Sequence, residues 1–159
     1  MELKKILVPL DGSVLAETAI PSAVSFAKEQ KASLVLVRAA EAPWLTGEDV
    51  VDAQVTVVRD AEEYLAALAG RLRGEGVKVE TSVWYGTPAA SIVDAAKAQR
   101  ADLIVMTSHG RSGLERLIMG SVAESVLRGT TTPVLLLRSA GAAVVEPEGK
   151  AKHMAASNA

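Results

Sequence analysis

The sequence predicts an α/β protein in which helices cover both faces of a parallel sheet. Short apolar runs alternate with segments of helical periodicity along the 159-residue chain. Each connection between apolar runs is long enough to hold a helix, and strands joined by helical crossovers lie parallel. Right-handed crossovers restrict the possible strand orders, but the periodicity does not choose among them.

The composition favours a single soluble domain. Hydrophobic residues make up 49 % of the chain and aromatic residues 3 %, so the expected core consists of Val, Leu, Ile and Ala. The chain has no cysteine, which excludes a disulfide framework and a thiolate site. A net charge of −2 without a concentrated basic run argues against nucleic-acid binding. The N-terminal apolar run is too short to span a membrane and lacks a cleavage site, so we expect a cytoplasmic protein.

The first half of the chain is expected to contain two strands and two helical segments. Apolar runs at Lys4–Leu10 and Ser33–Ala39 predict the strands. Ser13–Lys28 is helical in pattern, and Pro21 predicts a kink or a break inside it. The segment Asp49–Arg73 is also helical, although its β-branched first half is ambiguous by itself. The apolar positions of its second half are Ala61, Leu65, Leu68 and Leu72.

Three further strands are expected in the second half. The run Val77–Tyr85 alternates between apolar and polar residues, which predicts a strand near an edge of the sheet. Ala101–Thr107 is continuously apolar, as in a central strand. Thr132–Arg138 gives the fifth strand, and Pro133 can only open a strand or lie on an edge.

Two helices and a tail complete the expected domain. Thr87 is suited to an N-cap and Pro88 to the first helical position of a helix that runs to about Gln99. Another helix is expected to open at Gly120 and to continue to Leu127. The segment 140–159 is small, polar and aperiodic, which predicts a disordered tail after a folded domain at 1–139.

Two loops follow expected strands and carry residues suited to ligand binding. In open parallel sheets, ligands bind beyond the carboxyl ends of the strands. Gly110, Gly113 and the helix start at Gly120 can direct backbone N–H groups at a phosphate, or they can simply turn the chain. The sequence Ser-Val-Ala-Glu from Ser121 also fits a capping box, in which Ser121 would cap its own helix.

Other polar residues of these loops have two interpretations as well. Asp11 can accept hydrogen bonds from ribose hydroxyls, or it can serve as an ordinary turn residue. His109 can act as a base or contact a phosphate, although loop histidines more often do neither. Arg111 and Arg116 can neutralise phosphate charge. The tryptophans Trp44 and Trp84 are expected to pack rather than to stack on a ligand.

No common catalytic or nucleotide signature is present. The chain has no G-x-x-x-x-G-K-[ST] loop, and no G-x-G-x-x-G follows a strand. It also lacks a G-x-S-x-G nucleophile elbow and any metal-ligand spacing. We therefore expect neither catalytic residues nor a protein-bound metal.

Three segments together resemble the universal stress protein family. They are ILVPLDGS, GTPAASIVDAA and ADLIVMTSHGRSGLERLIMGSVAESVLRGTTTPVLLLR, and the resemblance extends from Lys4 to Arg138. It implies a five-stranded parallel sheet of order 3-2-1-4-5. It also implies a homodimer formed through the last strand, Pro133 to Leu137.

The ATP-binding branch of this family carries the motif G-x2-G-x9-G-[ST]. Here Thr107 replaces the first glycine, whereas Gly110, Gly120 and Ser121 match. The threonine adds a branched Cβ, and its hydroxyl can still donate to a phosphate. By the same resemblance, Asp11 would bind the ribose, and the backbone of Val37 would bind the adenine. Pro9 and Leu10 would line the pocket. The residues expected at the phosphates are Thr107, Gly110, Arg111, Gly120, Ser121 and Val122.

The resemblance favours a stress-response module that binds ATP, or AMP or ADP, with Mg²⁺ as a possible companion. Such a module would signal through its dimer or through a protein partner that the sequence does not identify. A slow ATPase or phosphoryl-transfer protein is one alternative, for which His109 and Arg111 are the nearby candidates. An interaction dimer that has lost nucleotide binding through Thr107 is the other.

Overall fold

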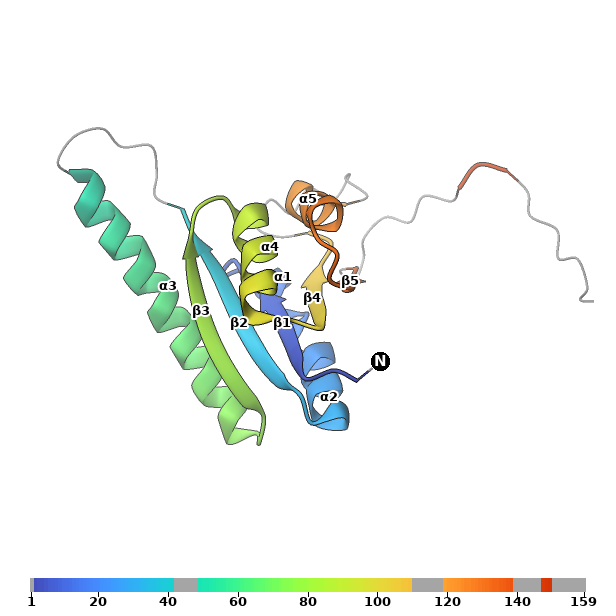
Figure 1. The fold of residues 1–159 in the computed structure, drawn as a ribbon. Coiled ribbons are helices and arrows are strands. Elements are labelled where there is room, and N and C mark those ends of the chain that lie inside the picture. The colour runs from blue at the N-terminus through green and yellow to red at the C-terminus, as the bar shows by residue number, and fades with distance from the viewer. Residues whose placement is uncertain (1, 42–48, 110–118, 139–146, 150–159) are drawn as a thin grey trace, which may run out of the picture.

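A computed structural model describes residues 2–41, 49–109, 119–138 and 147–149 of the chain. The strands are β1 (Lys5–Pro9), β2 (Ser33–Ala40), β3 (Lys78–Tyr85), β4 (Leu103–Thr107) and β5 (Val134–Leu137). The helices are α1 (Val14–Glu17), α2 (Ile20–Gln30), α3 (Asp49–Gly74), α4 (Pro88–Gln99) and α5 (Ser121–Gly129). All strand pairs are parallel and the order is β3-β2-β1-β4-β5, which confirms the expected sheet (Figure 1).

The central strand β1 is buried on both faces. Ile6 and Val8 pack in one apolar cluster with α2 and α3, whereas Leu7 packs in the opposite cluster with α4 and α5. All three side chains are fully buried. Successive strand residues point to opposite faces, so a continuous apolar run is what a two-sided core requires.

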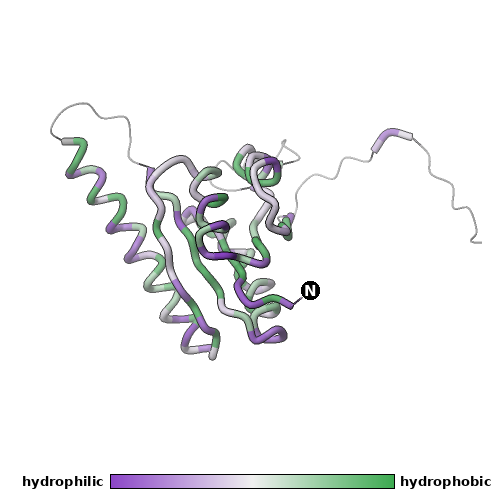
Figure 2. Tube along the Cα trace, in the orientation of Figure 1, coloured by the Kyte–Doolittle hydropathy of each residue, from purple (hydrophilic) through white to green (hydrophobic). Residues whose placement is uncertain are grey.

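Helix α3 lies along β2 and β3 on one face of the sheet, while α4 covers the other face (Figure 1). The β-branched segment at the start of α3, which was ambiguous in the sequence, is helical from Asp49 onwards. Figure 2 shows hydrophobic and hydrophilic stretches alternating along this helix, as expected for a helix with one buried face. The four positions taken from the helical spacing, Ala61, Leu65, Leu68 and Leu72, are all buried.

The segment in which a kink or a break was expected at Pro21 consists of two helices, and the break falls at Thr18 and Ala19, before the proline. Helix α1 ends at Glu17 and α2 begins at Ile20, so Pro21 lies in the first turn of α2. A proline is tolerated there because the first N–H groups of a helix have no intrahelical acceptor.

Some local expectations are corrected. The alternation in β3 holds for the buried Val79, but Tyr85, expected on the same face, is 54 % exposed. Thr87 takes the N-cap position of α4 as expected, yet its side chain makes no capping hydrogen bond.

Of the two tryptophans expected to pack, Trp84 does pack against the core, and its Nε1 donates to Ser82 Oγ at 2.9 Å. Trp44 lies outside the described residues. So does the tail from residue 140, except for residues 147–149.

Candidate functional site

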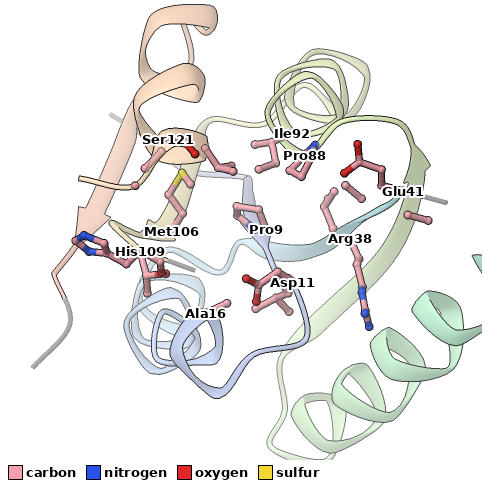
Figure 3. A pocket seen from close by; sticks show the side chains of 18 of the residues that line it. Pro9, Asp11, Ala16, Arg38, Glu41, Pro88, Ile92, Met106, His109 and Ser121 are labelled. Carbon is pink, nitrogen blue, oxygen red and sulfur yellow. The ribbon is translucent and has the colours of Figure 1, made fainter. Parts of the chain in front are cut away.

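A cavity of about 550 Å³ opens at the carboxyl ends of β1, β2 and β4. The strand order reverses between β1 and β4, and such a switch point is where open α/β sheets bind ligands. Residues from the ends of these strands, from the first turns of α4 and α5, and from α3 line the cavity (Figure 3). Its volume lies in the range of small-molecule sites.

Asp11 stands at the end of β1 on the cavity wall. Its Oδ1 accepts hydrogen bonds from Ser13 N at 2.9 Å and Ser13 Oγ at 2.6 Å. Ser13 Oγ in turn accepts from Ala16 N and caps α1. The turn interpretation of Asp11 is therefore correct, and it leaves room for the ligand interpretation, because a carboxylate can accept about four hydrogen bonds.

The end of β2 supplies backbone groups that the sequence did not reveal. The carbonyl of Val37 accepts from Leu10 N at 2.8 Å, so it is already used within the sheet. The carbonyl of Ala40 faces the other neighbour and accepts from Gly86 N at 3.2 Å. Because alternate residues of a parallel strand face alternate neighbours, Ala39 directs its N–H and C=O towards the β1 side.

Strand β1 ends at Pro9, opposite Val37, so within the described residues no strand pairs with Ala39 on that side. Ala39 lines the cavity. The pair of backbone groups that can meet a ligand therefore belongs to Ala39. The expectation that the Val37 backbone is available is wrong, although Val37 does line the cavity.

The start of α5 opens into the same cavity. Gly120 is the N-cap of this helix, and no side chain caps it. The capping-box interpretation is wrong, because Ser121 is the first helical residue and Glu124 accepts from Arg128 at 2.8 Å instead. Glu124 N is the first amide bonded within the helix, to Gly120 O at 3.0 Å. The amides of Ser121, Val122 and Ala123 precede it and belong to residues that line the cavity.

Gly120 is required by the packing of the loop itself. Its N–H donates to Ser108 O at 2.7 Å, and a Cβ on Gly120 would lie 2.9 Å from the same oxygen. This contact ties the beginning of α5 to the end of β4. A side chain at this position would push the two segments apart, whatever ligand binds.

Polar side chains at the end of β4 are buried against the cavity. Thr107, Ser108 and His109 are 7 %, 1 % and 8 % exposed. The hydroxyl of Thr107 donates to His109 O at 2.7 Å, and Ser108 Oγ and His109 Nδ1 form a hydrogen bond of 3.0 Å. The Thr107 hydroxyl was expected to be available to a phosphate. Its proton is instead donated to His109 O, and this hydrogen bond stabilises the loop that follows β4.

Most residues expected from the sequence meet at this cavity. Those on its lining are Pro9, Leu10, Asp11, Val37, Thr107, Gly120, Ser121 and Val122. Gly110 and Arg111, with Gly113 and Arg116, lie outside the described residues. Sequence reasoning missed Arg38, Ala39 and Ser108, which also line the cavity. None of the three carries a motif, and the position of Ala39 beyond the end of β1 follows only from the register of the two strands.

The doubly wound parallel sheet places the chain among the open α/β folds, in which the switch point of the sheet is the usual position of a ligand site. The chain belongs to the universal stress protein family, because the model of that family matches residues 2–138. A universal stress protein of Methanocaldococcus jannaschii is 35 % identical over 150 residues, which cover 85 % of this chain and 82 % of the relative.

Solved structures agree with this family. The protein MJ0577 superimposes with a TM-score of 0.78 at 26 % identity, covering 88 % of this chain and 99 % of that chain. The universal stress protein UspA of Lactobacillus plantarum gives a TM-score of 0.72 at 28 % identity, with coverages of 87 % and 99 %.

Two more distant neighbours carry adenine nucleotides. A universal stress protein in complex with cAMP has a TM-score of 0.59 at 24 % identity, with coverages of 86 % and 98 %. A family protein of Arabidopsis thaliana with AMP bound has a TM-score of 0.63 at 17 % identity, with coverages of 85 % and 91 %. At these identities the likeness concerns the fold.

The described residues contain neither a membrane-spanning helix nor a group of side chains suited to a metal ion. No helix in this part of the chain has both the length and the apolar character needed to cross a membrane. Within the same residues, no three His, Cys, Asp or Glu side chains are grouped so that they could hold a metal ion.

Proposed function

We propose that this chain binds an adenine nucleotide in the cavity at the ends of β1, β2 and β4. The observation that carries the proposal is the uncapped start of α5, which opens into the cavity lined by Asp11 and Ala39. Backbone N–H groups at a helix start, together with the helix dipole, attract a phosphate. Ser121, Val122 and Ala123 provide such groups.

The other corners of the cavity fit the rest of a nucleotide. The N–H and C=O of Ala39 match the acceptor and donor on the edge of adenine. The buried side chains of Ile92 and Met106 supply apolar walls for the ring. Asp11 can accept from the ribose hydroxyls, and the phosphates would extend from there towards Ser121. The complexes of family neighbours with cAMP and AMP support this class of ligand.

Within this class we propose ATP, held as part of a regulatory module. The match at Gly120 and Ser121 to the ATP-binding motif supports this choice. Mg²⁺ would arrive with the phosphates, since the described residues offer no ready group of metal ligands. We propose binding rather than turnover, because His109, the base considered from sequence, is buried and hydrogen-bonded to Ser108 through Nδ1.

Calorimetric titration with MgATP tests this proposal. The wild type should saturate, and Asp11→Ala should weaken binding about tenfold or more, since hydrogen bonds to charged groups contribute about 1.5–3 kcal/mol. Ser121→Ala should change the affinity little, because its backbone N–H remains. Asp94→Ala, on the exposed face of α4, is the matched control. Absence of binding at millimolar MgATP would overturn the proposal.

We also propose that β5 pairs with its copy in a homodimer. The amides of Ile104 and Ser108 donate to Pro133 O and Leu137 O, both at 2.8 Å, so Leu137 of β5 and Pro133 just before the strand face β4. The alternate residues Val134 and Leu136 therefore turn their backbone groups outward. Within the described residues, no strand pairs with that side of β5. An edge with half-buried apolar side chains invites pairing with another chain.

Sedimentation velocity of Val134→Pro checks the dimer. Proline removes the outward N–H at the first residue of the strand, a position where it is tolerated. We expect the variant to sediment as a monomer at concentrations where the wild type is a dimer. Val134→Ala keeps the N–H and should stay dimeric. A wild-type monomer, or a dimer in both variants, would contradict pairing through this edge.

A further inference from the structure

Asp11 lies on a segment that little apolar packing holds in place. The helix that follows it, α1, has four residues, and Ala16 is its only buried side chain. Val14 on the same helix is 83 % exposed. A helix of this length does not form on its own, because its nucleus costs more than its few hydrogen bonds return. Leu10, which is buried and hydrogen-bonded to Val37, fixes the β1 side of Asp11, whereas the segment that follows Asp11 depends largely on polar contacts with the rest of the fold.

Two such contacts lead to Tyr64 on α3. At the far end of the segment, the Tyr64 hydroxyl donates to Glu17 Oε1 at 2.8 Å. At the near end, the guanidinium of Arg38 lies between Gly12 and the ring of Tyr64. Its Cζ is 4.9 Å from the ring centroid, within the range of a cation–π contact.

The Arg38 guanidinium leaves little room for a side chain at Gly12. A Cβ at this position would lie 3.2 Å from Arg38 Nη2 and 3.3 Å from Cζ and Nη1. The φ of Gly12 is +83°, which also favours glycine. Figure 3 shows the Arg38 guanidinium at the edge of the cavity nearest α3. Among the described residues Arg38 has no ion-pair partner, so the ring and the loop hold it.

We propose that Tyr64 is a positioning residue for ribose recognition: through Arg38 and Glu17 it fixes the loop that carries Asp11. This inference rests on the proposed nucleotide binding and adds residues outside the phosphate motif. Tyr64 anchors both ends of the segment from Gly12 to Glu17, so Asp11 keeps one position relative to β2. A purely structural Tyr64 would instead affect every nucleotide equally.

The test compares two nucleotides that differ only in their ribose. The dissociation constant of 2′,3′-dideoxy-ATP divided by that of ATP measures how well the protein recognises the ribose hydroxyls. We expect a ratio of about ten or more for the wild type, as for hydrogen bonds to a charged group. In Tyr64→Phe, which keeps the ring under Arg38 but loses the bond to Glu17, the ratio should fall at least threefold. Binding of dideoxy-ATP should stay within about twofold of wild type.

The other tyrosine of the chain provides a matched control. Tyr85→Phe makes the same chemical change at an exposed position on β3 and should keep the wild-type ratio. Glu17→Ala removes the acceptor from the other side and should lower the ratio as Tyr64→Phe does. Glu17→Gln keeps an oxygen acceptor and should restore most of the ratio. Because Tyr64→Phe and Glu17→Ala remove the same hydrogen bond, either variant can test the inference if the other folds poorly.

The outcomes separate the inference from the proposed function. A wild type that binds neither nucleotide overturns the proposed function and this inference with it. A wild type that binds ATP while Tyr64→Phe retains its ratio overturns the inference alone. The same holds if the variant weakens both nucleotides equally.

Discussion

Thr107 replaces a glycine of the family's ATP-binding motif, and its surroundings explain how a threonine is accommodated. It lies at the end of β4 in regular parallel pairing with Leu137. The only described non-glycine residues with positive φ are Lys31 and Arg100, so the backbone at Thr107 makes no demand for glycine. The side chain bonds to His109 O and fixes the loop that follows. The replacement therefore does not by itself strain the site.

The first prediction concerns this hydroxyl. Thr107→Val keeps the shape of the side chain but leaves His109 O without its donor in a buried place. We expect the free energy of unfolding to fall by about 1–3 kcal/mol, measured by urea denaturation. Thr81→Val, at an exposed position on β3, should change it by less than about 0.5 kcal/mol. Equal stability of Thr107→Val and Thr81→Val would contradict a stabilising hydrogen bond from Thr107 to His109 O.

The second prediction concerns Tyr64 at alkaline pH. Burial, and then the hydrogen bond to Glu17, raise the pKa of Tyr64 above its ordinary value of 10.0. Above pH 10 the unfolded chain therefore loses this proton before the folded chain does, and stability falls as the pH rises. Below that pH the group has no such effect.

Urea denaturation on both sides of pH 10 checks this dependence. The free energy of unfolding should fall more steeply above that pH in the wild type than in Tyr64→Phe. Tyr85→Phe should follow the wild type, because Tyr85 is exposed. Parallel curves for the wild type and Tyr64→Phe would contradict the raised pKa.

At the scale of elements, the sequence was sufficient where one signal dominated. The apolar run of β1 and the helical spacing in the second half of α3 each allow one solution, because a core residue must lie on a buried face. The cap of α5 was different, since Gly120 and Ser121 are both acceptable N-caps. A long-range contact, Gly120 N to Ser108 O, decides between them, and no local pattern encodes it.

The third prediction concerns the exposed face of α3. Gly70 lies inside this helix, and a Cβ there would meet no atom within 4 Å. Gly70→Ala should raise the free energy of unfolding by about 0.5–1 kcal/mol, because alanine loses less backbone entropy in a helix. Gly12→Ala, where φ is +83° and Arg38 is close, should lower it instead. A destabilising Gly70→Ala would contradict the packing of α3 described here.

At the scale of the whole molecule, topology places together what the sequence separates. Asp11 and Ser121 could be proposed in advance, because both follow strands of a recognisable pattern. Ala39 could not, because its role depends on β1 ending at Pro9 while β2 continues to Ala40. Arg38 and Tyr64 meet only when α3 packs on β2, and neither carries a motif.

The most direct test of the account is the melting temperature with and without MgATP. A ligand at 100 times its dissociation constant adds about 2.7 kcal/mol to the folded state, which corresponds to roughly 5–10 °C for a chain of this size. If the cavity binds MgATP, the wild type and Asp94→Ala should show such a shift, and Asp11→Ala a much smaller one. No shift at saturating nucleotide, or an equal shift in Asp11→Ala, would contradict nucleotide binding at this cavity.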